Sequence, residues 1–402
     1  MKMHEREEQK RSYARVLLHV GLGLKEGQHV CVEAPAEAAD FVALLTEEAL
    51  EAGGRGVSVF WHSEGTDQAM LRKGCFLEDG PLGQAQLAAA EALASQGAAY
   101  LKLEAPSFLE GAGISGELLQ RKKLEDRRLR TLFQEKARGS GQTLACVPCP
   151  SWADKVYPHL REEELLPRLW QTVLSCTYSD REDPLAQWQS YLEAVTRRKQ
   201  ELDKRGYEEF HYFGGGTDFT IRPAEGDFWK GGCVRTKERV SVPNIPTQEV
   251  FLTPHKYSAS GHVAATMPVS WGGSLIEGIE LDFSEGRIVD CHAKSHEDLL
   301  RAVIETDEGS HFLGEMALVD GNNPIAKKEM LFYTTLYDEN ASCHLAIGNA
   351  IGPPVNRGER EKRGMNCSAV HMDFMVGSRE LCIEGRRPDG SWEELLRNGE
   401  LV

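Results

Sequence analysis

Residues 29–61 read HVCVEAPAEAADFVALLTEEALEAGGRGVSVFW. The apolar and β-branched residues at 29–33 and 57–61 predict two short strands. Between them, an apolar residue recurs at every fourth position from Phe41 to Ala49, which indicates one buried face of a helix, and a Gly-Gly pair ends that helix. A strand, a helix and a second strand in succession predict a unit whose two strands run parallel.

The same alternation continues beyond this unit. Strands are predicted at 99–103 and 144–147, and the helical patterns between and after the strands are these: 82–95, 117–138, 162–176 and 184–204. Strands that alternate with helices favour a parallel sheet with helices on its faces. We therefore predict an N-terminal α/β domain with a helical linker at 1–205.

From Tyr207 onward the pattern changes. Short strand-like pieces are separated by glycine turns, as in FHYF-GGG-TDFTI at 210–221 and in IELDF-SEGR-IVDC at 279–291. Such alternation is typical of antiparallel sheet. The sequence thus predicts an α/β protein whose second domain, 206–402, is α+β and largely antiparallel.

Composition limits the classes of partner. The 402 residues exceed the size at which a single core usually stops growing, which favours two domains. A formal net charge of −16 argues against nucleic acid as a partner, because phosphate binding needs basic stripes. We find no apolar run long enough to span a membrane and no signal-peptide core, so we expect a cytoplasmic protein whose ten cysteines are free thiols.

Acids and histidines gather in four short segments of the C-terminal half. These segments are QEV at 248–250, GEM at 314–316, DENASCH at 338–344 and HMD at 371–373. Histidine and carboxylate ligands suit zinc, cobalt, manganese or iron(II). On a strand, His371 and Asp373 would point to the same face, since side chains alternate with period two. That spacing places two ligands within reach of one ion.

Two of these acids lie inside apolar runs. Glu315 stands between Phe312-Leu313 and Met316-Ala317-Leu318, and Asp373 is followed by Phe-Met-Val. A carboxylate is costly to bury unless it is paired or bound to a metal. The surroundings of both acids therefore favour a buried metal site.

Eight stretches in order along the chain resemble one known family, the metalloaminopeptidases of the aminopeptidase T / aminopeptidase S type. They are LGLKEGQHVCVEAPAEAADFV, DPLAQWQSYL, GGGTDFTI, VPNIPTQEVFLTPH, GGSLIEGIELDFSEGRIVD, FLGEMALVD, TLYDENASCHLAIGNA and NCSAVHMDFMVGS. The resemblance implies an N-terminal α/β domain, a homodimer with enclosed active sites, and a two-metal site that releases N-terminal residues from short peptides. The metal ligands that it implies are Glu249, Glu315, Glu339, His344, His371 and Asp373.

Two-metal chemistry suggests a mechanism for this site. Four carboxylates close together are tolerable only beside cations, which favours two divalent ions over one, and we expect zinc, cobalt or magnesium. A water between two such ions loses its proton near neutral pH and can attack a peptide carbonyl. A carboxylate must carry that proton to the leaving amine. Glu315 and Glu249 are the candidates for this catalytic role, and the sequence does not decide between them.

One position departs from the family pattern. The resemblance implies a tyrosine seven residues after His344, where this chain has Ile351. A phenol beside the metals could stabilise an oxyanion. Its replacement keeps two alternatives open: a peptidase homologue with impaired catalysis, and an iron(II) dioxygenase that opens dihydroxypyridine rings. The second would use the facial triad His344, His371 and Asp373.

Overall fold

The computed structural model describes residues 3–106, 108, 116–352 and 356–402. The chain forms two compact units, one from residues 1–192 with 233–246 and the other from 193–232 with 247–402. This division differs from the single predicted boundary near Gly206. The first change from one unit to the other falls inside α8 (Pro184–Arg205). Residues 233–246, which follow the first part of the second unit, belong again to the first unit.

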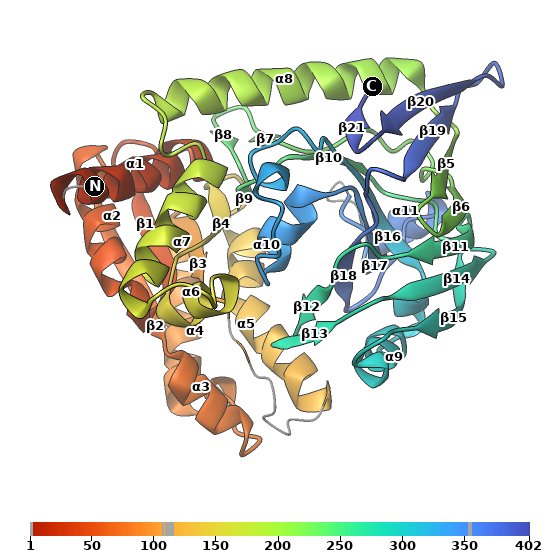
Figure 1. Ribbon diagram of the computed structural model, residues 1–402. Coiled ribbons are helices and arrows are strands. Elements are labelled where there is room, and N and C mark those ends of the chain that lie inside the picture. Colours follow the sequence, from red (N-terminus) through yellow and green to blue (C-terminus); the bar gives the residue numbers. More distant parts are fainter. Residues whose placement is uncertain (1–2, 107, 109–115, 353–355) are drawn as a thin grey trace. The chain divides into compact units, whose positions relative to one another are not determined.

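The first unit is built on a five-stranded parallel sheet in the order β2-β1-β3-β4-β9 (Figure 1). Its strands are β1 (His29–Pro35), β2 (Gly56–His62), β3 (Ala99–Glu104), β4 (Gln142–Cys146) and β9 (Asn244–Ile245). The first four match the predicted strands. No periodicity could reveal β9, because a pair of residues has too short a pattern.

Helices cover both faces of this sheet, as predicted. The helices are α1 (Met3–Arg15), α2 (Ala39–Glu51), α3 (Glu64–Leu71), α4 (Pro81–Ser95), α5 (Gly116–Lys136), α6 (Pro150–Val156) and α7 (Glu162–Cys176). On one face, α4 and α5 pack Ala94 and Phe133 against Tyr100. On the other, α1 and α7 bring Tyr13 and Trp170 together with Phe41 of α2. The parallel α/β prediction is thus confirmed.

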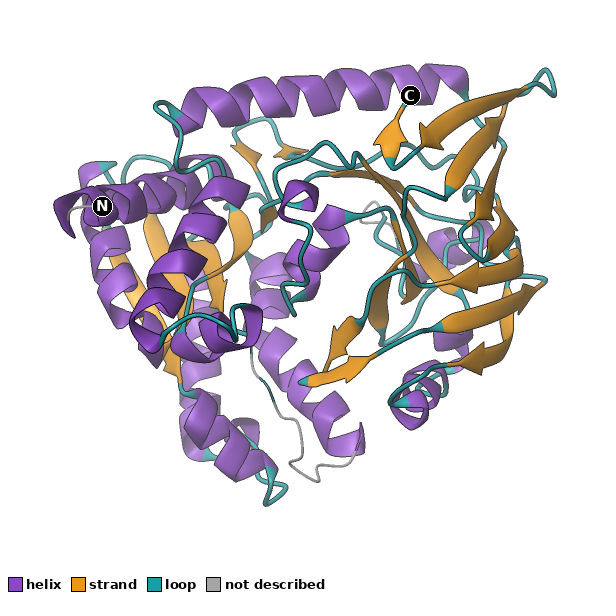
Figure 2. Ribbon diagram, viewed as in Figure 1, coloured by secondary structure: helices purple, strands orange, loops and turns teal. Residues whose placement is uncertain are grey.

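The second unit contains an eight-stranded antiparallel sheet in the order β15-β14-β11-β6-β5-β19-β20-β21 (Figure 2). Its strands are β5 (Glu209–Gly214), β6 (Thr217–Ile221), β11 (Ser260–Ala264), β14 (Glu280–Ser284), β15 (Arg287–His292), β19 (Cys382–Arg386), β20 (Trp392–Arg397) and β21 (Glu400–Leu401). The predicted glycine turns join β5 to β6 and β14 to β15. The antiparallel prediction for this half is therefore also confirmed.

A second antiparallel sheet of the same unit has four strands in the order β10-β16-β17-β18. They are β10 (Glu249–Leu252), β16 (Leu313–Val319), β17 (His344–Gly348) and β18 (His371–Met375). Every residue of β16 and β17 is buried. The remaining elements are the hairpins β7 (Val234–Arg235) with β8 (Val240–Ser241) and β12 (Val269–Trp271) with β13 (Ser274–Ile276), and the helices α9 (Glu297–Ile304), α10 (Thr335–Asp338) and α11 (Arg357–Lys362).

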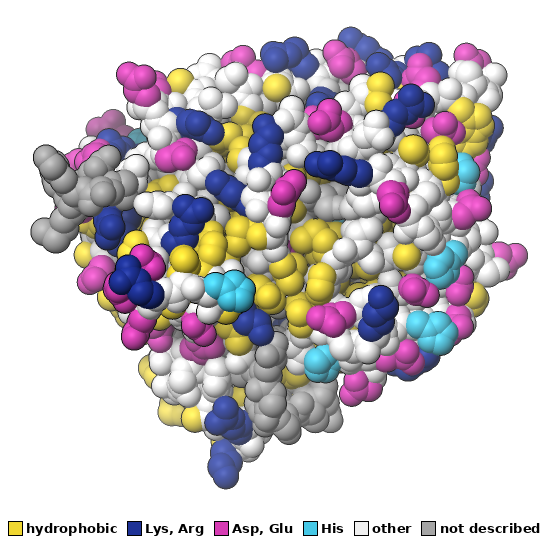
Figure 3. Space-filling model, in the orientation of Figure 1, with side chains coloured by type: hydrophobic (Ala, Val, Ile, Leu, Met, Phe, Trp, Pro, Cys, Tyr) yellow, Lys and Arg dark blue, Asp and Glu magenta, His cyan; other side chains and the backbone are white. Residues whose placement is uncertain are grey.

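Acidic and basic side chains are intermixed on the face that Figure 3 displays. On this face the basic side chains do not form a continuous stripe. The formal net charge of the chain is −16. Among the described residues, none of the helices is both long and apolar enough to cross a membrane.

Candidate metal centre

One face of the four-stranded sheet carries the predicted ligands. Residues that lie opposite each other in a β-ladder point to the same face, as do residues two apart on one strand. Glu315 of β16 lies opposite Ala346 of β17, which lies opposite Asp373 of β18. His344 and His371 are two residues from Ala346 and Asp373, so four ligands share one face.

Glu249 reaches the same face from the fourth strand. It lies opposite Val319 of β16, and Val319 is four residues from Glu315. Its side chain therefore points the same way as Glu315. The sheet register, which is set by pairings between segments far apart in the sequence, brings acids and histidines from four strands to one surface.

Small residues lie between the ligands on this face. Ala317 is opposite His344, Ala346 is opposite Asp373, and Gly348 is opposite His371. Ala317 and Ala346 are fully buried. Because none of the three extends beyond a Cβ atom, none of them fills the space between the longer side chains of the candidate ligands.

The ligand atoms form two groups that share one residue. Glu249, Glu315 and His344 make the first, and Glu315, His371 and Asp373 make the second; within each group one ligand atom per residue lies within 4.8 Å of the others. His344 Nε2 is 3.0 Å from Glu249 Oε2, and His371 Nε2 is 3.2 Å from Asp373 Oδ1. Glu315 therefore stands between two three-residue sites.

Main-chain carbonyls orient both histidines. Nδ1 of His344 lies 3.1 Å from the carbonyl oxygen of Ser342, and Nδ1 of His371 lies 2.8 Å from that of Asn349. A carbonyl only accepts, so Nδ1 must carry the proton in each ring. Whenever Nε2 carries no proton, its lone pair faces the carboxylates, as a metal-binding histidine requires.

Two carboxylate oxygens in this cluster are buried without a hydrogen bond. They are Oε2 of Glu249 and Oε2 of Glu315. Each lies near a histidine Nε2, at 3.0 and 3.6 Å, yet neither accepts a proton from it. Buried polar atoms are rarely left unsatisfied. Oxygen and nitrogen lone pairs that face a common point fit a shared cation, so these donors fit divalent metal ions.

Without a cation, two acids of this cluster, Glu315 and Glu339, hold their protons unusually tightly. Burial raises the pKa of Glu315, as does the neighbouring charge of Glu249. Burial likewise raises the pKa of Glu339 well above its usual range, with repulsion from Asp373 adding to it. Such shifts measure how strongly the site disfavours uncompensated negative charge.

The His371–Asp373 pair shifts in the opposite sense. Burial alone would disfavour both charges, but the carboxylate of Asp373 raises the pKa of His371 to about 9. In turn His371 lowers the pKa of Asp373 to about 2 against the effect of burial. The pair is therefore ionised at neutral pH, and a metal ion would have to displace the imidazolium proton.

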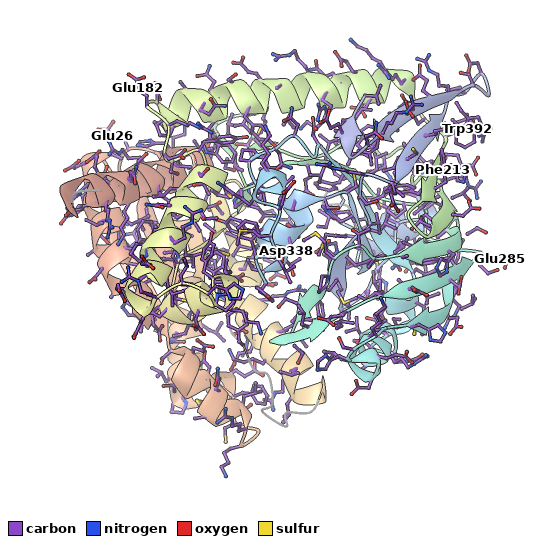
Figure 4. All side chains as sticks on the ribbon, in the orientation of Figure 1. Glu26, Glu182, Phe213, Glu285, Asp338 and Trp392 are labelled. Atoms are coloured by element: carbon purple, nitrogen blue, oxygen red, sulfur yellow. The ribbon has the colours of Figure 1, made fainter. Side chains whose placement is uncertain are left out.

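Glu339 reaches the cluster from a helical turn rather than a strand. It begins the 3-10 turn Glu339–Ala341 directly after α10, whose last residue Asp338 is labelled in Figure 4. Glu339 belongs to neither three-residue group, but its carboxyl interacts electrostatically with Asp373, Glu249 and Glu315. Its carboxyl is therefore close enough to the cluster to interact with its charges.

Asp338 has a different role from its neighbour. Its carboxylate is buried and accepts hydrogen bonds from the main-chain N–H groups of Phe332 and Thr334, at 2.7 and 3.0 Å. Burial raises the pKa of Asp338 to about 8. Sequence reasoning named Asp338 with Glu339, but only the structure separates the residue that holds the loop from the one that faces the cluster.

Ile351 lies at the Thr253 end of the site. Thr253 follows β10 and donates its Oγ1–H to the carbonyl oxygen of Ile351 at 2.9 Å. Thr253 is two residues from Phe251 and four from Glu249, so this contact occurs beside the sheet face that carries the ligands. The side chain of Ile351 is 44% exposed and brings no polar atom to this end.

Comparison with known proteins agrees with this chemistry. Residues 6–401 match the thermophilic metalloprotease family (M29). The chain belongs to this family of metalloproteases. As a member of a metalloprotease family, it uses divalent metal ions, which is the chemistry that the carboxylate and histidine groups fit.

The M29 relatives match along nearly the whole chain. Aminopeptidase T of Thermus thermophilus is 39% identical, with 97% of both chains covered. Aminopeptidase AmpS of Bacillus subtilis is 36% identical, with 96% of this chain and 97% of the relative covered. The solved structure of wild-type AmpT from Thermus thermophilus superimposes with a TM-score of 0.87 at 35% identity, covering 99% of each chain.

A second solved structure is similar in fold. The 2,5-dihydroxypyridine dioxygenase of Pseudomonas putida matches with a TM-score of 0.55 at 13% identity, covering 100% of this chain and 98% of that one. A likeness at this identity shows the fold alone. This match shows that the dioxygenase has a similar fold, but it does not support dioxygenase chemistry in this chain. The M29 match supports a peptidase.

Proposed function

We propose that this M29 protein is an aminopeptidase that uses two divalent ions to release N-terminal residues from short peptides. The observation that carries the proposal is the position of Glu315, which belongs to both three-residue groups on one sheet face. A carboxylate between two sites is the arrangement that bridges a hydrolytic metal pair. The aminopeptidase relatives in the same family support the same reaction.

The proposed ligand sets follow from the geometry. Glu249, Glu315 and His344 would hold one ion, and Glu315, His371 and Asp373 would hold the other, with Glu339 as a further ligand of the cluster. One histidine and at least two carboxylates for each ion suit zinc or cobalt, and the carboxylate-rich shell also admits magnesium.

Bound divalent ions would supply an acidified water and a polarised carbonyl. The chain supplies the proton carrier. Glu315 belongs to both groups, so both of its oxygens face ion positions. Glu249 belongs to one group and keeps an oxygen with which to accept a proton from the attacking water and pass it to the leaving amine. We therefore assign Glu249 as the general base and Glu315 as the bridge.

The central test replaces Glu315 by glutamine. Leucine and arginine anilides are supplied with zinc or cobalt, and ions per chain are measured by plasma mass spectrometry. The wild type should turn over an anilide and hold two ions, whereas Glu315→Gln should hold at most one and lose about 100-fold or more in kcat. Glu280→Gln, at an exposed position of β14, is the matched control and should behave as wild type.

Two results would contradict the proposal. One is a wild type that cleaves no member of a wide anilide and dipeptide panel in the presence of either metal. The other is a wild type that binds a single ion in the active state. Stoichiometric iron in protein purified without air, together with ring cleavage of a dihydroxypyridine, would instead support the dioxygenase alternative.

We further propose a homodimer that acts in the cytoplasm. The dimer follows from the family resemblance, and the ten cysteines, all of them free thiols, agree with a reducing compartment. Light scattering coupled to size-exclusion chromatography measures the assembly, and a monomeric mass across a wide concentration range would contradict the dimer.

A further inference from the structure

A short segment extends the metal-bearing sheet beyond β10. The main chain of Lys230 pairs with Phe251 through two hydrogen bonds, N–H to carbonyl in each direction, at 2.9 and 3.0 Å. Gly231 permits this close pairing, since its φ is +126° and a Cβ there would lie 2.4 Å from the carbonyl oxygen of Glu249. The segment is thus a fixed neighbour of the strand end that carries Glu249.

The pairing decides where the Lys230 side chain points. Two residues that exchange both hydrogen bonds in an antiparallel ladder project to the same face. Phe251 is two residues from Glu249 and so shares its face. The Nζ of Lys230 lies 5.4 Å from the centroid of the Phe251 ring. Lys230 therefore extends over the face on which the acids and histidines gather.

The ammonium group of Lys230 interacts electrostatically with Glu315 of the cluster. Burial lowers the pKa of Lys230, while Asp227 and then Glu315 act to raise it. Its side chain is 14% exposed. The group is thus held in poorly hydrated surroundings, yet part of it remains open to a bound molecule.

The hydrogen bonds of Lys230 leave one donor unused. Nζ donates to Oδ2 of Asp227 at 2.5 Å and to the carbonyl oxygen of Phe228 at 3.2 Å. An ammonium has three N–H bonds, and within the part of the chain that the structure describes the third meets no acceptor. A partly buried cation with a spare donor is equipped to bind an oxygen of a ligand.

Asp227 fixes this donor at the Ile351 end of the site. Its side chain is fully buried, and its Oδ2 also accepts the main-chain N–H of Thr253 at 2.7 Å. Thr253 in turn bonds the carbonyl oxygen of Ile351. Lys230, Asp227, Thr253 and Ile351 are thus linked by consecutive hydrogen bonds, and at this end the Ile351 side chain provides no polar group.

We propose that Lys230 is a substrate-binding residue whose free N–H donates to the carbonyl oxygen of the scissile peptide bond as negative charge develops on it. This inference rests on the proposed peptidase function. A fixed cation in a poorly hydrated site stabilises an oxyanion more than it stabilises a neutral carbonyl, because the electrostatic attraction grows with the charge. Lys230 thereby acts as an oxyanion donor at the Ile351 end of the site.

The test compares two variants. Lys230→Met keeps most of the side-chain length and removes the charge, whereas Lys230→Arg keeps the charge. Lys199→Met is the matched control, since Lys199 donates to the carbonyl oxygen of Gly231 in the same segment. For a leucine anilide, Lys230→Met should lose about 100-fold in kcat with little change in KM, Lys230→Arg should recover part of that loss, and Lys199→Met should match wild type.

A binding measurement completes the test without turnover. On the metal-loaded protein, calorimetry should show that Lys230→Met loses about 100-fold in affinity for a phosphinic analogue of a leucyl dipeptide. That anionic tetrahedral probe mimics the transition state. Affinity for leucine amide, which lacks the charge, should be unchanged. Ion content and thermal unfolding of each variant confirm that the site and the fold are intact.

Three results would overturn the inference while leaving the peptidase proposal standing. They are a Lys230→Met kcat within about threefold of wild type, an unchanged affinity for the phosphinic probe, and an equal loss in Lys199→Met. A rise in KM at constant kcat would also contradict it, because that pattern indicates uniform binding of substrate and transition state. An inactive wild type would instead overturn the peptidase function.

Discussion

The rings of His344 and His371 are oriented by hydrogen bonds to the main chain and not by hydrogen bonds from Nδ1 to acidic side chains. The carbonyl oxygens of Ser342 and Asn349 accept from Nδ1 of the two rings. Every residue has a main-chain carbonyl, so no sequence pattern could single out the carbonyls of Ser342 and Asn349. The main chain fixes which ring nitrogen faces the carboxylates, and that nitrogen can serve as a metal ligand when it carries no proton.

Metal affinity should therefore depend on pH. In metal-free protein the pKa of His371 is raised from 6.5 to about 9 by Asp373. The stabilisation from this charged pair is fully present below pH 6.5 and is lost as the pH rises through about 9. A metal must displace the same proton, so its affinity should rise by up to about tenfold per pH unit until about pH 9.

Calorimetry of zinc binding in buffers of different ionisation enthalpy measures the protons released. His371→Asn should release about one proton fewer per chain and show a shallower dependence on pH. An affinity for zinc that is constant between about pH 6 and about pH 9 would contradict the assignment of His371 as a ligand.

In the four-stranded sheet, candidate ligands alternate with small residues on one face of β17. On β17, His344 is followed two positions later by Ala346 and then by Gly348, all on one face. Neither Ala346 nor Gly348 extends beyond a Cβ atom into the layer of carboxylates and imidazoles. The sequence shows the alanines, but only the register shows that they lie beside Glu315 and Asp373.

Filling that layer should remove metal before it unfolds the protein. Ala346→Val adds two methyl groups between Glu315 and Asp373, and overpacking of this kind costs about 1–3 kcal/mol of stability. We expect a loss of at least one ion per chain and a large fall in kcat, with the protein still folded. Ala145→Val, at an equally buried alanine of β4, is the matched control and should keep its metals. Wild-type ion content in Ala346→Val would show that the layer is not where the ions bind.

At the scale of the element, the fold was largely predictable. Strands β1 to β4 and helices α4, α7 and α8 occupy nearly the ranges that periodicity indicates, because each carries several turns or alternations of pattern. Helices α1, α3 and α6 were not predicted. Strand β9 was not predicted either, and its two residues pair with β4 only after the chain has left the first unit. Such a short strand is specified by its neighbour, not by its own residues.

At the scale of the whole molecule, the second unit gathers four carboxylates in a chain that already carries a net charge of −16. Burial raises the pKa of Glu315 and Glu339, which shows that their charges are poorly compensated without a cation. Bound ions should therefore contribute to the stability of the fold as well as to catalysis.

Removal of metal should lower the melting temperature. Binding at 100 times the dissociation constant stabilises a folded protein by about 2.7 kcal/mol for one site, so a chelator should lower Tm by several degrees and zinc should restore it. Differential scanning calorimetry measures both steps. Glu315→Gln should respond less to the chelator than wild type, and an identical Tm with and without chelator would contradict a structural contribution of the ions.

The sequence by itself determined the two architectures, the family and the residue types of the site, since periodicity, glycine turns and ordered motifs are local signals. It also located the acids that burial makes costly, such as Glu315. The tertiary structure decided that Glu315 lies between two ligand groups, that alanines leave room beside it, and that Lys230 reaches over the same face. Those facts depend on sheet register, in which one step moves every side chain to the opposite face, and the register arises from pairing between segments that are far apart in the chain.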